Sequence, residues 1–144
     1  MKVVVCEDGS EYTDRFRRFL GAQFGFARAG HFAEALLLAN GADALLLDLD
    51  FRRTSPALLV DESGSPDPRA APEVQGILIL KALRSRRVAV PALLFADLDD
   101  ASHARRLEAQ LAPLRVVPSS EGLPRVAQLL RELVKSATGS VEKS

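Results

Sequence analysis

The stretch ALLLDLDF, residues 44–51, is an apolar run that ends in two carboxylates separated by one leucine. Four consecutive apolar residues after the turn-like NGAD predict a strand that is buried on both faces, as in a parallel sheet. A run of this kind commonly ends in a turn residue without chemical function. The stretch therefore raises the question of why a buried strand should end in Asp48 and Asp50.

Strand-like and helix-like segments alternate along the rest of the chain. Residues 2–6, KVVVC, are apolar and β-branched like a buried strand, and an apolar helical stripe follows within 7–23, with Ser10 as the expected N-cap. Further strands are expected at 24–29, 43–48, 88–96 and 114–117, and further helices at 31–41, 72–87, 99–112 and 121–137. This alternation predicts an α/β fold, a doubly wound parallel sheet of five strands with five helices.

The composition favours one globular domain. Its 144 residues suffice for one core, and 19 basic residues balance 19 acidic ones, which argues against attraction to nucleic acid or an anionic membrane. The single cysteine, Cys6, excludes an internal disulfide and suits a reducing compartment, and the N-terminal apolar stretch is too short for a signal peptide or a membrane span. We therefore expect a cytoplasmic protein with one domain over residues 1–137 and a flexible tail over 138–144.

One segment interrupts the alternation. Residues 52–75, RRTSPALLVDESGSPDPRAAPEVQ, separate the third strand from the third helix, where such folds normally use a few residues. The segment has four prolines, three serines and mixed charge around one apolar island, Ala57–Val60. A loop of this length is either disordered or functional. The composition favours a mobile insertion, and the alternative is a docking lid over the site, anchored by the island.

Acidic residues follow two strands that would be neighbours in a sheet of order 2-1-3-4-5. Glu7 and Asp8 follow the first strand, and Asp48 ends the third, at the switch point where such sheets bind ligands. Like charges held this close are costly unless a cation neutralises them or a pKa rises, and oxygen-only ligands suit Mg²⁺. The alternative is that Glu7 and Asp8 only begin a helix, where acidic residues are favoured. Acids at the ends of two adjacent strands favour the metal site.

The layout of these motifs resembles the receiver domains of bacterial two-component response regulators. VVVCED resembles the first strand and acidic pair of that family, DALLLD its third strand, VQGILILKALR its third helix with Gly76, VPALLFA its fourth strand and VVPSSEGL the loop after its fifth. The resemblance implies a flavodoxin-like sheet of order 2-1-3-4-5 and a phosphoacceptor at Asp48. It also implies Mg²⁺ held by Glu7, Asp8, Asp48 and the backbone carbonyl of Asp50.

Three switch positions depart from the family pattern. Ala96 stands where the family has a Ser or Thr hydroxyl that bonds the phosphoryl group, Val117 replaces a lysine, and Arg115 replaces an aromatic switch residue. A phosphoryl group moves a loop only where donors are present to receive its oxygens. The sequence therefore predicts chemistry at Asp48 without the usual readout. Candidate substitute cations are Arg52, Arg53 and Arg115.

From this resemblance we expect an atypical single-domain receiver in phosphorelay signalling that is not itself an enzyme. A histidine kinase or a small phosphodonor would phosphorylate Asp48, and output would come from protein binding through strands 4 and 5 and the last two helices, or through the insertion, 52–75. No nucleic-acid or membrane partner is expected, and a homodimer is left open. One alternative is a pseudo-receiver that binds partners without phosphorylation. A less favoured alternative is a small metal-dependent phosphatase in which Asp50 assists Asp48.

Overall fold

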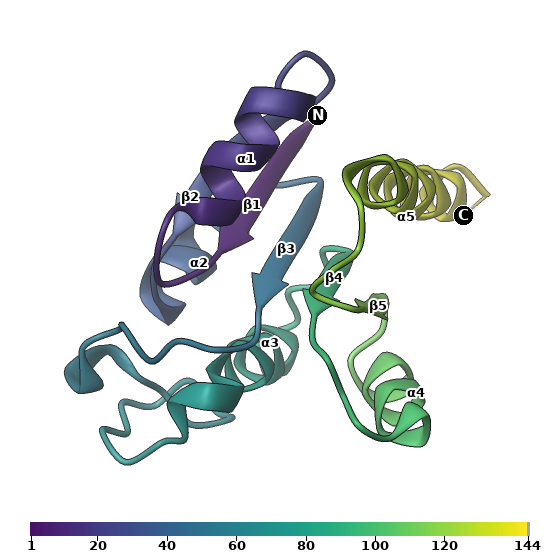
Figure 1. Ribbon diagram of the computed structural model, residues 1–144. Helices are drawn as coiled ribbons and strands as arrows, with labels where there is room; N and C mark the ends of the chain where they lie inside the picture. The colour runs from purple at the N-terminus through teal and green to yellow at the C-terminus, as the bar shows by residue number, and fades with distance from the viewer. Residues whose placement is uncertain (144) are drawn as a thin grey trace.

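Five parallel strands form one sheet in the order β2-β1-β3-β4-β5 (Figure 1). The computed structural model describes residues 1–143, with side chains for residues 1–136. The strands are β1 Lys2–Cys6, β2 Gly25–Ala29, β3 Ala44–Asp48, β4 Ala92–Phe95 and β5 Leu114–Val117. The predicted fold class and strand order are confirmed.

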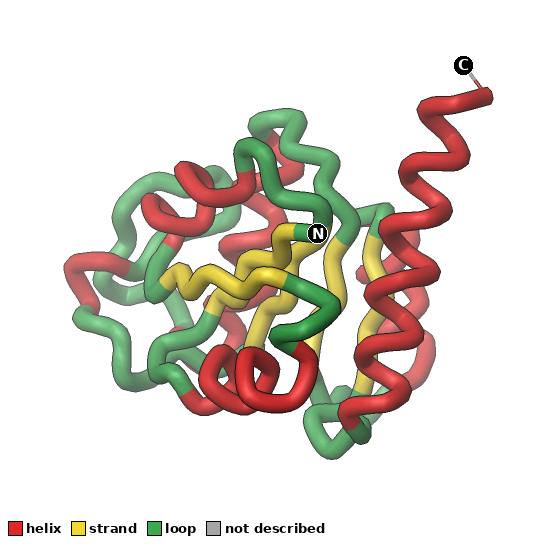
Figure 2. Tube along the Cα trace, turned by 90° about the horizontal axis from the view of Figure 1, so that it is seen from above, coloured by secondary structure: helices red, strands yellow, loops and turns green. Residues whose placement is uncertain are grey.

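Five α-helices and two 3₁₀ helices connect and flank the strands. They are α1 Glu11–Leu20, α2 Phe32–Ala39, η1 Pro56–Leu58, η2 Pro72–Val74, α3 Gln75–Ser85, α4 Ala101–Gln110 and α5 Leu123–Lys143. Figure 2 shows helices on both faces of the sheet. In the described part of the chain, none of the helices combines the length and apolar character needed to span a membrane. The flexible tail at 138–144 stays a prediction, because Ser144 and the side chains of 137–143 lie outside the described residues.

The core has two layers because successive strand side chains point to opposite faces of the sheet. In β3, Leu45 and Leu47 pack with α2, α3 and α4, whereas Leu46 packs with α1 and α5. Strand β3 lies at the centre of the sheet, so both of its faces are covered, which explains its uninterrupted apolar sequence. Cys6 is also fully buried, and burial, with the charge of Glu7, raises the pKa of its thiol to about 12. Cys6 is therefore a core residue rather than a reactive thiol.

The insertion packs against α2 and α3 through the second half of its apolar island. Leu59 and Val60 are buried, and Val60 exchanges two hydrogen bonds with the buried Gln75 side chain, at 2.9 and 3.0 Å. An isolated antiparallel bridge joins Val60 to Pro66. Together with α2 the insertion borders an apolar groove of about 580 Å³, which lies apart from Asp48. The island thus anchors the insertion beside α2, and the mobility of the insertion stays a prediction.

Candidate functional site

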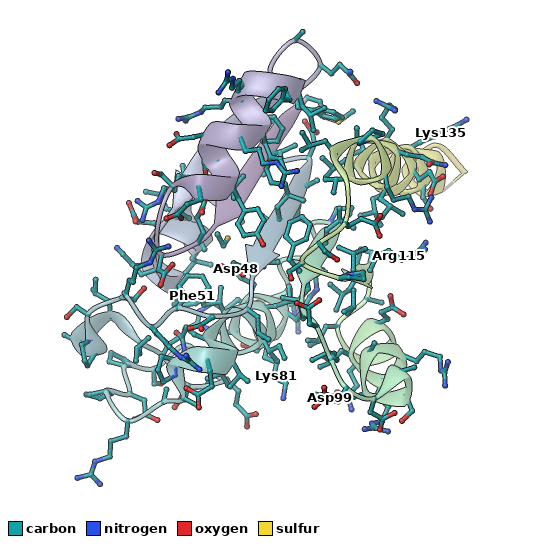
Figure 3. All side chains as sticks on the ribbon, in the orientation of Figure 1. Asp48, Phe51, Lys81, Asp99, Arg115 and Lys135 are labelled. Atoms are coloured by element: carbon teal, nitrogen blue, oxygen red, sulfur yellow. The ribbon has the colours of Figure 1, made fainter. Side chains whose placement is uncertain are left out.

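The carboxyl ends of β1 and β3 meet at one edge of the sheet. Cys6 of β1 lies opposite Leu47 of β3 in the parallel register, so the residues that follow both strands come together. Figure 3 shows Asp48 at the tip of β3. A pocket of about 190 Å³ at this edge is lined by Asp8, Asp48, Asp50, Arg52 and Arg53. Three acidic side chains and two guanidinium groups therefore share one small pocket.

Asp48 is half-buried among these charged groups. Burial raises the pKa of its carboxyl to about 6, and the charges of Asp8, Glu7 and Asp50 add to the increase. The backbone N–H of Leu49 opposes the increase by donating to Asp48 Oδ1 at 2.9 Å. At neutral pH the ionised form still predominates. Oδ1 is oriented by this bond, and Oδ2 remains the candidate nucleophilic atom.

Replacing Asp48 by asparagine is expected to stabilise the metal-free protein near pH 7.5 and to have little effect near pH 4. The folded pKa lies above the unfolded one, so the folded state binds the proton more tightly and stability falls as pH rises from about 4 through about 6. Two pKa units correspond to about 3 kcal/mol, which solvent screening of the half-buried carboxyl reduces to about 1 kcal/mol. Urea unfolding in EDTA at both pH values measures this difference. A substitution effect that is the same at both pH values would contradict it.

Glu7 faces helix α1 instead of the pocket. Its carboxylate accepts hydrogen bonds from the N–H groups of Tyr12 at 3.1 Å and Thr13 at 2.7 Å, and from the Thr13 hydroxyl at 2.6 Å. Ser10 occupies the N-cap position, as expected, but its side chain makes no capping bond. Glu7, which is only 1% exposed, supplies the cap instead. The role of metal ligand expected for Glu7 would require these bonds to open.

Asp8 is held by Arg53. The backbone N–H of Arg53 donates to Asp8 Oδ2 at 2.8 Å and its guanidinium to Asp8 Oδ1 at 3.1 Å. The same guanidinium bonds both carboxylate oxygens of Glu11, at 2.7 and 2.9 Å. Hydrogen bonding from Arg53 lowers the pKa of Glu11 to about 2, and the two carboxylates raise the pKa of Arg53. Arg53 thus links the insertion to the loop after β1 and to α1.

The other two candidate cations, Arg52 and Arg115, pair with carboxylates other than Asp8. Arg52 pairs with Asp50, Nε to Oδ2 at 3.3 Å, and its backbone N–H donates to Asp50 Oδ1 at 2.9 Å. Arg115 lies on β5, and its Nε is 4.0 Å from Glu108 Oε2 on α4. Figure 3 places Arg115 well away from Asp48. Of the three arginines, Arg53 is the one that contacts Asp8.

Two of the three altered switch positions lie next to a second pocket. Ala96 and Val117 are buried neighbours, with the Ala96 N–H donating to the Val117 carbonyl at 2.9 Å, and they line a pocket of about 340 Å³. The Asp97 carboxylate accepts bonds from the N–H of Ser119, at 3.0 Å, and from its hydroxyl. Apolar side chains therefore stand at both positions, and Asp97 and Ser119 join the loops after β4 and β5.

Tyr12 lies in the helical stripe expected within 7–23, and the sequence gives no sign of its place near the site. Its ring stacks on Phe95 with centroids 5.1 Å apart and planes 6° apart. Burial raises the pKa of the Tyr12 hydroxyl, and the charges of Asp48, Glu7 and Asp97 add to the increase. Tyr12 is the only tyrosine in a chain without tryptophan. It is therefore a natural spectroscopic reporter of the Asp48 pocket.

The donor chemistry of the pocket fits a hard cation, since Asp8 and Asp48 offer carboxylate oxygens and Asp50 is expected to offer its backbone carbonyl. Among the described residues, however, no group of three His, Cys, Asp or Glu side chains is arranged to hold a metal ion. The counter-ion on Asp8 is the Arg53 guanidinium. Asp8 is thus already paired with a positive group.

Comparisons with known proteins agree on the fold. No protein-family model matches the sequence, and no curated protein matches it. The structure is similar to the signal receiver domain of a putative LuxO repressor protein from Vibrio parahaemolyticus, with a TM-score of 0.74 and 11% identity over 99% of this chain and 96% of that one. It is also similar to the receiver domain of the Francisella response regulator 1452, with a TM-score of 0.69 and 18% identity over 94% and 98% of the two chains.

A third similar structure is the BeF₃-activated N-terminal receiver domain of Klebsiella pneumoniae RstA. Its TM-score is 0.64 and its identity 18%, over 93% of this chain and 98% of that chain. At these identities the likeness concerns the backbone, and it covers nearly the whole chain in each case. The chain therefore has the receiver-domain fold of response regulators.

Proposed function

We propose that the chain is a receiver-type signalling module of a two-component or phosphorelay system, with Asp48 as its phosphoacceptor. The observation that carries this proposal is the position of Asp48, half-buried at the end of β3 in a pocket it shares with Asp8 and Asp50. Burial, with the charges of Asp8, Glu7 and Asp50, raises the pKa of its carboxyl to about 6, and perturbed pKa values of this kind are common at functional sites. The receiver-domain fold agrees with this function.

The proposed reaction is the transfer of a phosphoryl group to Asp48. The Leu49 N–H holds Oδ1, so that Oδ2 attacks phosphorus, the bond from phosphorus to the leaving group breaks, and an acyl phosphate forms. Asp8, Asp48 and the backbone carbonyl of Asp50 would hold Mg²⁺, which when bound neutralises charge on the phosphoryl oxygens. The phosphodonor is a histidine kinase or a small phosphorylated molecule. The module itself only receives the group and acts on a partner.

Output is proposed to come from protein binding. Two surfaces are candidates, namely the face formed by β4, β5, α4 and α5, and the insertion over 52–75. On the first surface, Ala96 and Val117 offer a phosphoryl group neither hydroxyl nor ammonium. This observation favours a second candidate function, a pseudo-receiver that binds partners without phosphorylation.

Treatment with acetyl phosphate and Mg²⁺ separates the two functions. We expect intact-mass spectrometry to show one added phosphoryl group on the wild type and on the matched control Asp50→Asn, and none on Asp48→Asn. Asp50 lies in the same pocket and the substitution removes the same charge, so the pair isolates the nucleophile. No adduct on the wild type would favour the pseudo-receiver, and an adduct that persists in Asp48→Asn would exclude Asp48 as acceptor.

A further inference from the structure

We propose that Arg53 is a built-in counter-cation of the Asp48 pocket, which a divalent cation must displace from Asp8 in order to bind. The start of the insertion is then the segment that responds to binding. The inference takes its site from the proposed function, but it concerns cation binding and does not depend on phosphorylation.

Arg53 is partly exposed, but its backbone and its side chain both bond the nearly enclosed Asp8. Both its backbone N–H and its guanidinium donate to Asp8, whose side chain is only 5% exposed. The guanidinium continues to Glu11 with two further hydrogen bonds. Gly9 leaves space for it, because a Cβ at that position would collide with Arg53 Nη2 and with the Glu11 carboxylate. Bidentate bonding of this kind is the stronger form of ion pair.

A bound divalent cation and Arg53 compete for the same carboxylate. Asp8 uses one oxygen for the Arg53 N–H and the other for the guanidinium. Its side chain is nearly enclosed, so little room is left for a further ligand on Asp8. Two positive groups held this close would also repel each other in a partly buried site. The two cations therefore exclude each other at Asp8.

Displacement of Arg53 would act on the insertion because anchors lie on both sides of it. On one side, Phe51 is fully buried and its N–H donates to the Pro72 carbonyl at 2.8 Å. On the other side, Leu59 is buried. Between these anchors Arg53 joins the segment to Asp8 and Glu11, so that its release would loosen the start of the insertion while the Arg52–Asp50 pair and the Thr54–Gly30 bond remain. The loops after β4 and β5, by contrast, stay joined by the Asp97–Ser119 bonds.

A Mg²⁺ titration followed by Tyr12 fluorescence, and independently by the thermal midpoint, tests this proposal. Arg53→Gln is expected to bind Mg²⁺ about tenfold more tightly than the wild type, a difference of about 1.4 kcal/mol. Arg52→Gln is the matched control, since it removes the same charge from the neighbouring residue, which pairs with Asp50. Its affinity should stay within about threefold of the wild type, because Arg52 pairs with the exposed Asp50 and not with the nearly enclosed Asp8.

Equal Mg²⁺ affinity of Arg53→Gln and wild type, or binding to neither, would overturn the proposal. An equal gain in Arg52→Gln would also overturn it, because the effect would then be one of net charge. Labelling by acetyl phosphate is scored separately. Arg53→Gln that binds Mg²⁺ more tightly but is never labelled would refute phosphorylation and support the counter-cation. If the protein is labelled but Arg53→Gln leaves the Mg²⁺ affinity unchanged, the result would support phosphorylation and refute the counter-cation.

Discussion

Replacing Gly76 by alanine is expected to destabilise the protein by about 3 kcal/mol and to disturb the Asp48 pocket. A Cβ at this position would collide with the carbonyl oxygen of Asp48 and lie 3.0 Å from Leu49 Cα. These are backbone atoms, which cannot rotate away, so either α3 or the end of β3 must shift. The close approach also brings the Gly76 N–H to the Leu49 carbonyl at 3.0 Å. Overpacking of this kind typically costs about 1–3 kcal/mol and occasionally more.

Gly122→Ala is the matched control for this substitution. The nearest atom to a Cβ at Gly122 is Pro124 Cδ at 3.8 Å, an ordinary contact, so we expect a change below about 0.5 kcal/mol. Urea unfolding of both variants measures the difference. Similar stabilities of Gly76→Ala and Gly122→Ala would show that α3 does not need a glycine against β3.

Replacing Glu7 by alanine is expected to destabilise the metal-free protein by about 3 kcal/mol. The substitution leaves the N–H groups of Tyr12 and Thr13 and the Thr13 hydroxyl without their acceptor. Thr13 is 1% exposed, so water cannot easily replace the lost carboxylate there. A buried donor left without a partner costs about 1–3 kcal/mol. The loss should appear in urea unfolding carried out in EDTA.

Asp8→Ala serves as the comparison for Glu7→Ala. It removes a neighbouring carboxylate whose partner Arg53 is 59% exposed, so a smaller loss than that of Glu7→Ala is expected. If the main role of Glu7 were that of a metal ligand, its removal in EDTA would relieve repulsion in the acidic cluster. Stabilisation by Glu7→Ala would therefore contradict the capping role.

The fold could be predicted because its signal lies in local periodicity. The apolar run over residues 44–47 is uninterrupted because β3 is central, and the alternation with helices leaves few topologies for a chain of this length. Gly41 is the last residue of the helical segment expected at 31–41, and it adopts φ 91°, which favours glycine and suits a helix end. Pro124 is the second residue of α5, in the first turn, where proline is tolerated. Each of these features depends on neighbours in sequence.

The site was harder to predict because its contacts are made across the sequence. Glu7 precedes the first helical residue by four positions, and spacing alone does not distinguish a capping carboxylate from a metal ligand. The Arg53–Asp8 pair joins residues 45 positions apart, through an insertion without periodicity. From the sequence alone, Arg53 is only one of three candidate cations. The structure distinguishes Arg53 from the other two because the chain after the buried Phe51 brings its backbone N–H and its guanidinium to Asp8.

The most direct test is the resonance of the Arg53 backbone amide and Nε–H in ¹H–¹⁵N spectra of the wild-type protein, recorded with and without saturating Mg²⁺. We predict that both resonances shift together with that of Asp8, because Arg53 loses its bonds to the Asp8 carboxylate, while the amide of Ser119 changes little. Shifts at Asp8 and Asp48 with Arg53 unchanged would contradict this account, because the metal and the guanidinium would then occupy the pocket together.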